Sequence, residues 1–570
     1  MIRTERLEKD VKTIAGFTQT PGEGATRPTF SAAWAQAMQY VASEASAAGC
    51  QWRTDAAGNG HAWPESLLAN ETRWLCGSHL DSVPHGGDFD GVAGVVAALE
   101  LLRSAKEDGR AMPLEMVVFA EEEGTTFGLG MIGSRLWTGA LAPEQLQNFR
   151  NAGGETYIEA GRPHGVDPAR FCPDRIQPKR YFGFVEIHIE QGPSMWRSGQ
   201  RLAVVTAIAG RKQYRVTLHG EANHAGATPM PQRRDALCAA AEMILAIEKL
   251  PAEISAEAVA TVGLLTNYPN AVNVVPDRTE FTIDLRAPSD ALLAGADTGV
   301  RAIVMEIARR RGINREMEVT ESIGACPLDE RLCKRLAGAA REPIVTSVSG
   351  ALHDSAIIAP HVPTAMLFIP SRDGISHNPA EFSRIEDLAA AAELLERVVR
   401  RPTISRINEM TSSEFLSVCG GAFEHSPWIA ERAWQSRPFA SIADLHEKMT
   451  SVVSGADIEK KLALVRAHPD LVGRLAREGK LTRESSSEQA AAGLAKLSES
   501  EVAAFERFNA DYRNKFGFPF VICARENRKD AILEAMPPRL ANSRDAELAT
   551  ALAEIFKIAR LRLADAIWEN

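Results

Sequence analysis

The residues of this chain best suited to chemistry are histidines and carboxylates in short motifs, most of which contain glycine. They are His79 in GSHLD, Asp90 in GGDFDG, Glu122 and Glu123 in EEEG, His188 in EIHIEQG and His377 in ISHNP. Imidazoles and carboxylates together are the ligands that zinc, manganese and similar divalent metals accept. One carboxylate of this set is left over, and a hydrolase needs such a group as a base for water.

Asp90 is the best candidate for a carboxylate shared by two metals, because the glycines around it leave it accessible at the head of a predicted helix. In the acidic run Glu121–Glu123, one residue can bind metal while its neighbour faces the attacking water. The residues alone leave open which acid does which. A single histidine or aspartate would more often be a polar residue with local partners, but the whole set indicates a metal hydrolase.

Predicted strands and helices lead directly into these motifs. Trp74–Ser78 and Met116–Ala120 are short apolar runs that end at the first and third motifs, and Gly91–Ala105 is an apolar helical pattern directly after Asp90. This alternation predicts an α/β domain with a largely parallel sheet. The ligands would then lie at the carboxyl ends of strands, where open α/β sheets have their sites.

A second unit is predicted as an insertion at residues 210–325. Its predicted strands are Gln213–His219, Ala258–Leu265 and Arg278–Arg286, and its predicted helices are Arg234–Leu250 and Arg301–Arg311. This order favours a small α+β domain with an antiparallel sheet. Because His377 follows the insertion, the metal-binding α/β domain is expected to comprise residues 1–209 and 326–403.

Residues 404–570 carry mainly helical patterns, which predict a separate all-α domain. Three motifs occur in it. His468 precedes a proline in HPDL, residues 485–489 (SSSEQ) resemble a helix start, and residues 516–522 (FGFPFVI) form an apolar segment. From physical chemistry alone, a helix end, a cap and a core segment explain them.

Composition excludes several classes of function. The chain has 570 residues, a net charge of -10 and a pI of about 5.8, which argues against a nucleic-acid or polybasic membrane surface. It shows no apolar run of about 20 residues and no apolar signal core at its N-terminus, so a cytoplasmic protein is expected. The eight cysteines are scattered without a Cys-x-x-Cys pair, so no cysteine metal site is predicted.

Residues 1–403 resemble the branch of the di-metal, aminoacylase-like and carboxypeptidase-like peptidase family that contains allantoate amidohydrolase, ureidoglycolate amidohydrolase and N-carbamoyl-L-amino acid hydrolase. The metal ligands that this resemblance implies are His79, Asp90, Glu123, His188 and His377. Asp90 would bridge two divalent ions, with manganese or zinc expected first. Glu122 would be the general base, an assignment that Gly124 favours, and Asp81 would orient His79.

The inserted unit resembles the dimerisation or lid domain of that family through residues 222–230 (ANHAGATPM). The resemblance implies that His224 reaches the site of a partner subunit in a homodimer and stabilises the oxyanion. The simpler alternative is a loop histidine that bonds its own backbone. Asn273 and Arg286 match substrate-binding positions, and a guanidinium suits the carboxylate of an N-carbamoyl acid.

The resemblance also gives Gln191 as a substrate contact and His353, in GALHDS, as a substrate or supporting contact. The implied reaction is hydrolysis of a ureido or amide bond. Water gives a proton to Glu122 and attacks the carbamoyl carbon, His224 and metal hold the oxyanion, and Glu122 returns the proton to the leaving nitrogen.

Residues 404–570 resemble 2-oxo-4-hydroxy-4-carboxy-5-ureidoimidazoline (OHCU) decarboxylase through the three helical-domain motifs together. That resemblance implies His468 as the catalytic acid or base, Glu488 and Gln489 as substrate-binding residues, and Arg562 as a substrate contact, with Arg560 as a competing choice. It implies no metal and no organic cofactor, because the substrate ring can delocalise the developing carbanion.

The two resemblances together predict a bifunctional enzyme of ureide breakdown that acts on small molecules. One domain would make (S)-allantoin and the other would hydrolyse allantoate, while a separate allantoinase would open the ring. An N-carbamoyl-L-amino acid hydrolase and a ureidoglycolate amidohydrolase remain alternatives for the first domain, and a non-catalytic scaffold for the second. A metal peptidase fits the ligands but not residues 190–193 (EQGP).

Overall fold

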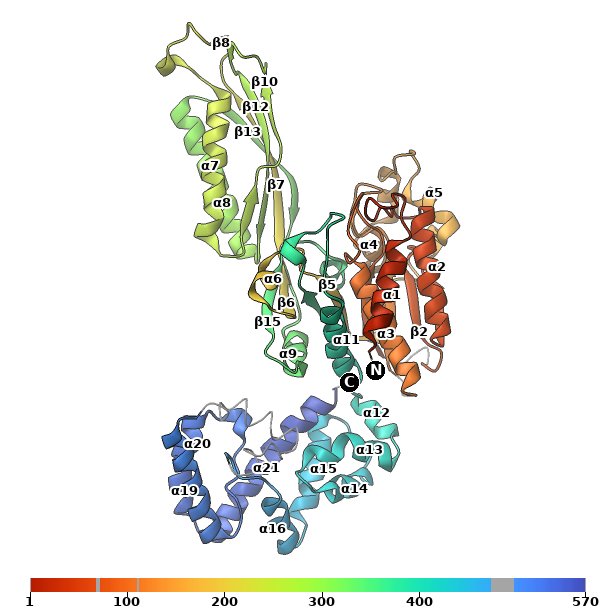
Figure 1. Cartoon of the computed structure of the whole chain (residues 1–570), viewed down its shortest axis with the longest axis vertical. Helices are drawn as coiled ribbons and strands as arrows, with labels where there is room; N and C mark the ends of the chain where they lie inside the picture. The colour runs from red at the N-terminus through yellow and green to blue at the C-terminus, as the bar shows by residue number, and fades with distance from the viewer. Residues whose placement is uncertain (1, 68–71, 110–111, 473–496, 569–570) are drawn as a thin grey trace. The chain divides into compact units, whose positions relative to one another are not determined.

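The computed structural model describes residues 2–67, 72–109, 112–472 and 497–568 (Figure 1). The chain divides into two compact units, Met1–Arg400 and Arg401–Asn570, and each is described by itself. No helix in the described part of the chain is long and apolar enough to cross a membrane.

The first unit is built on a nine-stranded sheet. Its strands are β1 (Cys50–Thr54), β2 (Gly60–Pro64), β3 (Arg73–His79), β4 (Leu114–Phe119), β5 (Tyr181–Ile189), β6 (Ala203–Ile208), β14 (Cys326–Pro327), β15 (Val345–Ser349) and β16 (Thr364–Ile369). The order is β1-β2-β4-β3-β5-β16-β6-β14, with β15 beside β6. The four central strands β4, β3, β5 and β16 are parallel, and β1, β2 and β14 pair antiparallel. The predicted α/β class is confirmed.

Helix α3 (Val92–Glu107) anchors the sheet to its helical layer. Every residue from Val92 to Ala105 is buried, which is the pattern of a helix enclosed on all sides. It packs against β3 and β5 and against the helices α1 (Thr4–Ala15), α2 (Ala32–Ala47) and α11 (Ile385–Val399). The residue that precedes this helix is therefore held by the core of the unit.

A smaller subdomain is inserted between β6 and β14. Its five-stranded antiparallel sheet has the order β10-β12-β7-β13, with β9 beside β12. The strands are β7 (Gly210–His219), β9 (Val259–Thr261), β10 (Leu265–Tyr268), β12 (Arg278–Ala287) and β13 (Asn314–Ile323). Helices α7 (Ala236–Ile254) and α8 (Asp290–Arg311) cover one face of the sheet, as Figure 1 shows. A two-stranded ribbon, β8 (Asn223–His224) and β11 (Val274–Val275), lies at its far end.

Three sequence expectations for this subdomain were wrong in detail. The single strand predicted at Ala258–Leu265 is two short strands, β9 and β10. The helix predicted from Arg301 begins at Asp290, where the Ser289 side chain caps it. Its first turns were not predicted because glycine, aspartate and threonine interrupt the helical pattern there. Strand β13 was not predicted, because most of its residues are exposed and polar and it has no apolar alternation.

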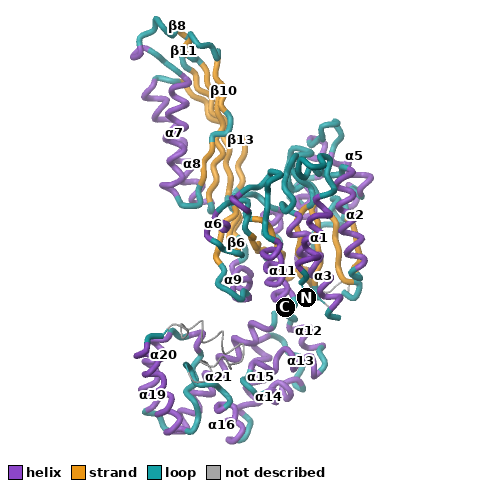
Figure 2. Tube along the Cα trace, in the orientation of Figure 1, coloured by secondary structure: helices purple, strands orange, loops and turns teal. Residues whose placement is uncertain are grey.

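The second unit contains helices and loops throughout its described residues, which Figure 2 shows in purple and teal. Its helices are α12 (Ile404–Glu409), α13 (Ser412–Cys419), α14 (Pro427–Trp434), α15 (Ile442–Ser454), α16 (Ile458–Arg466), α19 (Glu499–Phe516), α20 (Lys529–Leu540) and α21 (Arg544–Ala566). Aromatic residues such as Phe415, Tyr512 and Phe518 belong to one apolar core. The predicted all-α class of this region is confirmed.

Candidate functional site

The predicted metal ligands converge at one edge of the nine-stranded sheet. His79 ends β3, the acidic run Glu121–Glu123 follows β4, His188 is near the end of β5, and His377 is in the loop after β16. These four strands are adjacent and parallel, so their carboxyl ends meet. Asp90 joins them just before α3.

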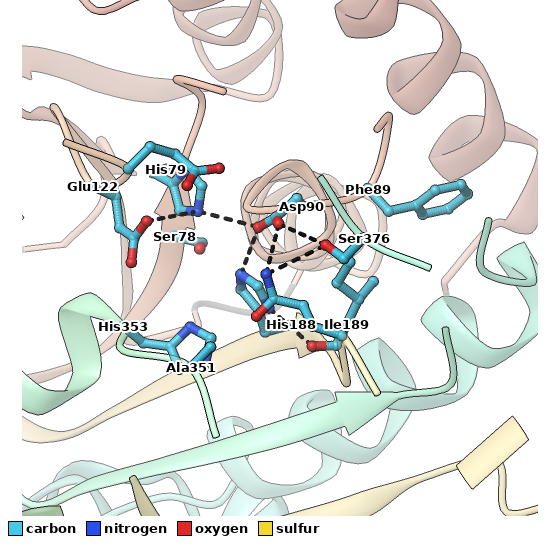
Figure 3. Close-up of polar contacts among 12 residues, drawn as sticks. Ser78, His79, Phe89, Asp90, Glu122, His188, Ile189, Ala351, His353 and Ser376 are labelled. Atoms are coloured by element: carbon cyan, nitrogen blue, oxygen red, sulfur yellow. Dashed lines mark hydrogen bonds and ion pairs between the residues drawn. The ribbon is translucent and has the colours of Figure 1, made fainter. Parts of the chain in front are cut away.

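Asp90 lies at the centre of this cluster (Figure 3). Its Oδ1 is 3.1 Å from Nε2 of His188 and 3.6 Å from Nε2 of His79, and its Oδ2 is 3.3 Å from Nε2 of His377. The Nε2 atom of His377 is also 3.5 Å from Oε2 of Glu123. Two groups with metal-binding geometry therefore share one carboxylate: His79, Asp90 and His188, and Asp90, Glu123 and His377.

The buried donor atoms fit divalent metal ions. Nε2 of His79, Nε2 of His188 and Oε1 of Glu123 are buried without a hydrogen-bond partner among the described residues. Nδ1 of His79 donates to the carbonyl of Asp81 at 3.0 Å, and Nδ1 of His188 donates to the carbonyl of Ile189 at 3.0 Å. These bonds leave both Nε2 lone pairs facing the centre, as metal-binding histidines require.

Asp81 contacts His79 mainly through its carbonyl oxygen; its Oδ1 is 3.8 Å from Nδ1 of His79, and its carboxylate also holds the acidic turn. Oδ1 and Oδ2 accept the backbone N–H groups of Glu122 at 3.3 Å and Glu123 at 3.1 Å. One residue thus fixes both a histidine and the acidic turn.

The three adjacent acids have different surroundings. Oε1 of Glu121 accepts the backbone N–H groups of Thr126 and Phe127, so its side chain is turned into the protein. Glu122 and Glu123 line the pocket instead. Oε2 of Glu122 is 3.6 Å from Nε2 of His79. Burial, together with the nearby Glu123 carboxylate, raises the pKa of Glu122 well above its ordinary value. This geometry favours Glu122 as the base and Glu123 as a ligand.

Glu381 supports the centre and was missed in the sequence. Its Oε1 accepts the N–H groups of Phe89 at 2.9 Å and Asp90 at 3.1 Å, and its Oε2 accepts the hydroxyl of Ser376 at 3.0 Å. Ser376 also donates to Oδ2 of Asp90 at 3.1 Å. A lone glutamate far along the chain from Asp90 carries no signal of this contact.

A cavity of about 250 Å³ opens onto the centre. Its lining is formed by Asp90, Glu122, Glu123, Leu129, Gly130, Met131, Arg135, His188, Gln191, Arg211, Arg286, Glu321, Ile323, Ala351, Leu352, His353 and His377. The lining therefore contains the acids and imidazoles of the candidate metal centre together with three arginines, Arg135, Arg211 and Arg286. An anionic substrate could therefore place its reacting group at the centre and its charge on a guanidinium.

Three predicted substrate contacts lie at this cavity. Gln191 donates through Nε2 to Oδ2 of Asp90 at 2.8 Å. Arg286, near the end of β12, is held by Asp284 and donates to the carbonyl of Gly350 at 2.7 Å. The buried His353 ring has its centroid 4.4 Å from that of His188, and burial lowers its pKa well below the ordinary value. His353 is therefore neutral.

His224 and Asn273 do not line this cavity. Both are exposed and lie at the two-stranded ribbon of the inserted subdomain, where the Asn273 carbonyl accepts the N–H of Ala225 at 2.9 Å. Nδ1 of His224 accepts the backbone N–H of Gly226 at 3.1 Å, the local contact expected of a loop histidine. A contribution of His224 to a partner's site stays a prediction.

A second cluster lies in the helical unit around His468. Nδ1 of His468 donates to the carbonyl of Leu464 at 3.0 Å, and its buried Nε2 has no hydrogen-bond partner among the described residues. Burial, with the charge of Arg562, lowers the pKa of His468 to about 4. At neutral pH the ring is uncharged and its Nε2 lone pair is available as a base.

Arg562 and Arg560 differ in their surroundings. Arg562 is buried and donates through Nη1 to Oε2 of Glu424 at 2.7 Å, whereas Arg560 is exposed and pairs with Glu526. The buried Glu424 was missed in the sequence, where it is a lone acid far from both motifs. Glu488 and Gln489 lie outside the described residues.

Residues 75–401 match the Peptidase family M20/M25/M40. The chain belongs to this family. Residues 408–564 match the OHCU decarboxylase family, so the M20 domain is followed by a C-terminal OHCU decarboxylase domain. The protein thus combines a hydrolase and a lyase in one chain.

Several relatives of the M20 domain are named as amidohydrolases. The N-carbamoyl-L-amino acid amidohydrolase of Geobacillus stearothermophilus is 39% identical over 411 residues, covering 70% of this chain and 98% of the relative. The allantoate amidohydrolase of Escherichia coli (strain K12) is 34% identical over 403 residues, covering 69% and 96%. The crystal structure of an amidase of the hydantoinase/carbamoylase family from Burkholderia multivorans is similar with a TM-score of 0.66 and 32% identity, covering 70% and 97%.

Gly91 allows the close approach of α3 to the His79 ring in the candidate metal centre. It has φ of 66°, and a Cβ atom there would lie 2.5 Å from the His79 ring. Gly91→Ala should therefore displace His79 and lower both metal content and hydrolase kcat/KM, the latter about 10- to 100-fold. Gly109→Ala is the matched control, because Gly109 has φ of 62° and open space around it. Equal losses in the two variants would show that backbone strain alone is responsible.

The depressed pKa of His468 predicts the pH dependence of the decarboxylase. A histidine with a pKa of about 4 stays neutral from pH 8 down to about pH 5, so kcat/KM should be flat over this range. It should fall only near pH 4, where the ring gains a proton. Initial rates of CO2 release across this range are the measurement. A decline that begins near pH 6.5, the ordinary histidine value, would contradict the prediction.

Proposed function

We propose that the chain is a bifunctional enzyme of ureide breakdown, with a cytoplasmic location. The decarboxylase domain converts OHCU to (S)-allantoin, and the M20 domain hydrolyses allantoate to ureidoglycine or ureidoglycolate, ammonia and CO2. The observation that carries this assignment is the OHCU decarboxylase domain in the same chain as an M20 domain similar to allantoate amidohydrolases. A separate allantoinase must open the allantoin ring between the two reactions.

In the hydrolase site the ligands would be His79, Asp90, Glu123, His188 and His377, with Asp90 shared. Two divalent ions held there, manganese or zinc, would polarise the ureido carbonyl and make water more acidic. Glu122 accepts the proton of the attacking water and returns it to the leaving nitrogen. Arg286 binds the substrate carboxylate, and Gln191 and His353 position the groups around it.

The oxyanion partner comes from a second copy of the chain. His224 and Asn273 lie away from the cavity of their own subunit and near Val272, which is fully exposed. Val259, Leu264 and Leu265, on and beside the edge strands, are also exposed apolar residues of the inserted subdomain. Exposed apolar residues on edge strands are typical of an interface. We therefore include a homodimer through this subdomain in the proposal.

In the decarboxylase site the neutral His468 is the proton carrier and Arg562 contacts the polar groups of the substrate. Glu424 fixes the guanidinium of Arg562. The substrate loses CO2 from its carboxylate, its ring holds the electron pair, and the ring takes up one proton, which Nε2 of His468 accepts from water and passes on. These steps need no metal and no organic cofactor.

A second candidate for the M20 domain is hydrolysis of N-carbamoyl-L-amino acids, which the relative of 39% identity favours. Ammonia release reports the hydrolysis of every candidate substrate, because each frees ammonia and CO2 from its cleaved ureido group, so the relative rates on the different substrates distinguish the two functions. Full-length protein reconstituted with manganese or zinc should be offered allantoate, ureidoglycolate and N-carbamoyl-alanine in parallel, with product formation measured for each. A clear preference for N-carbamoyl-alanine would overturn the ureide assignment of this domain.

A further inference from the structure

An ion pair without an assigned role faces the hydrolase cavity. Nη2 of Arg211, in β7, is 2.5 Å from Oε2 of Glu321, in β13. Both residues line the cavity together with Arg286. Arg286 is the direct cross-strand neighbour of Arg211, so one face of the inserted sheet presents two guanidinium groups and a carboxylate to the substrate.

A β-bulge places Glu321 on this face. Up to Val319, strand β13 pairs in register with β7, and Val319 is opposite Tyr214. Tyr214 is buried in the core shared with α7 and α8. The register then shifts, and Glu321 is opposite Gln213, which lies on the other face with Arg211. Without the extra residue, side-chain alternation would keep Glu321 on the helix-covered face. Bulges next to active sites commonly redirect a side chain in this way.

The pair is not internally satisfied. Nε of Arg211 is a buried atom without a hydrogen-bond partner among the described residues, and Oε2 of Glu321 has an ionic contact with Nη2 of Arg211 that lacks hydrogen-bond geometry. Arg286, by contrast, is held by Asp284 and the Gly350 carbonyl. Polar atoms kept from water cost free energy when they lack partners. The Arg211–Glu321 pair therefore offers both a donor and an acceptor to a ligand.

We propose that Arg211 and Glu321 bind the ureido group of the substrate that is not cleaved. This inference rests on the proposed allantoate hydrolase function. Allantoate carries two ureido groups and a carboxylate on one carbon. With one ureido group at the metal centre and the carboxylate on Arg286, the second points along the sheet face. Its carbonyl accepts from Arg211 and its N–H groups donate to Glu321, so the planar group matches the pair.

This contact determines specificity. An N-carbamoyl amino acid with an apolar side chain would leave the pair desolvated without partners, a penalty that sites built for hydrogen bonds use to reject apolar analogues. Ureidoglycolate offers a single hydroxyl, which is too small to bridge both residues. The expected order of kcat/KM is therefore allantoate, then ureidoglycolate, then N-carbamoyl-alanine.

The test compares Glu321→Gln, Arg211→Met and a matched control on the same two strands. Arg215 and Glu318 form the next ion pair along β7 and β13, 3.5 Å apart and exposed, so Glu318→Gln and Arg215→Met change the same charges outside the cavity. We expect each cavity variant to lower kcat/KM for allantoate about 10- to 100-fold. N-carbamoyl-alanine should change less than about twofold, and the control variants should change neither substrate.

A second variant tests the inference by an expected gain of activity, so that the conclusion does not rest on a loss of activity alone. The double substitution Arg211→Leu with Glu321→Leu should raise kcat/KM for N-carbamoyl-leucine while that for allantoate falls. Metal content and thermal unfolding of each variant show whether it is folded. Equal losses on all substrates, or none, would overturn the inference and leave the hydrolase function standing. A wild-type enzyme without allantoate hydrolysis would instead overturn the proposed function, and this inference with it.

Discussion

Asp90→Asn should abolish hydrolysis by the M20 domain and leave decarboxylation unchanged. Asp90 is shared by the group of His79 and His188 and the group of Glu123 and His377, so its loss should affect both proposed metal positions. An amide oxygen is a weaker, uncharged ligand, and the Lewis-acid contribution at stake is several kcal/mol. We expect kcat/KM for the hydrolase to fall about 10³-fold or more, with loss of bound metal by elemental analysis.

The matched control is Asp88→Asn in the same glycine-rich turn, because Asp88 is exposed and belongs to neither ligand group. Decarboxylation by the same preparation shows that the second unit is intact, and thermal unfolding of the variant reports on the folding of the first unit, since the chain divides into two compact units. Treatment of the wild type with a chelator should reproduce the Asp90→Asn pattern. Loss of metal from only one position would show that Asp90 does not bridge.

His468→Gln should remove decarboxylation and leave the hydrolase unchanged. The side chain supplies the only base proposed for that site, and general acid–base catalysis typically contributes 10²- to 10⁴-fold, so a fall of this size is expected. His446→Gln is the control, since His446 is a half-buried histidine of the same unit whose Nε2 is used by the Phe556 carbonyl. The measurement is the initial rate of CO2 release from OHCU.

If His468→Gln decarboxylated OHCU as fast as the wild type, the domain would be a scaffold and not a second enzyme. Arg562→Lys and Arg560→Lys provide a further comparison. Arg562 is buried against Glu424, and a lysine cannot reproduce the guanidinium geometry, so only the first variant should lose activity.

The clustering of the candidate metal ligands could be predicted from the sequence because each belongs to a contiguous motif, most of them at or soon after the end of a strand and Asp90 in the glycine-rich turn before α3. The strand pattern then placed those motifs at one sheet edge. Glu381, Glu321 and Glu424 could not be predicted in this way. Each is a single acid whose partner lies far along the chain or on a neighbouring strand, and an isolated acid in a sequence most often marks a solvated surface.

The fold was predictable where apolar periodicity was strong, as in α3 and the central strands. Strand β13 was not predicted, because its exposed and charged residues show no apolar alternation. Its bulge also could not be predicted, because it depends on pairing with β7. A register shift of one residue is a tertiary property, and it decides which side of the sheet Glu321 occupies.

Because α3 is buried, substitutions near Asp90 are constrained by the core, whereas substitutions on the uncovered face of the inserted sheet are not. Asp90 precedes a helix enclosed on all sides, so altering the position of the shared ligand would require repacking the core of the unit. Arg211, Arg286 and Glu321 instead belong to the sheet face that α7 and α8 leave uncovered. Efforts to redirect this hydrolase to other carbamoyl compounds should therefore vary the cavity-facing residues of β7 and β13 and keep Arg286 of β12, the proposed partner of the substrate carboxylate.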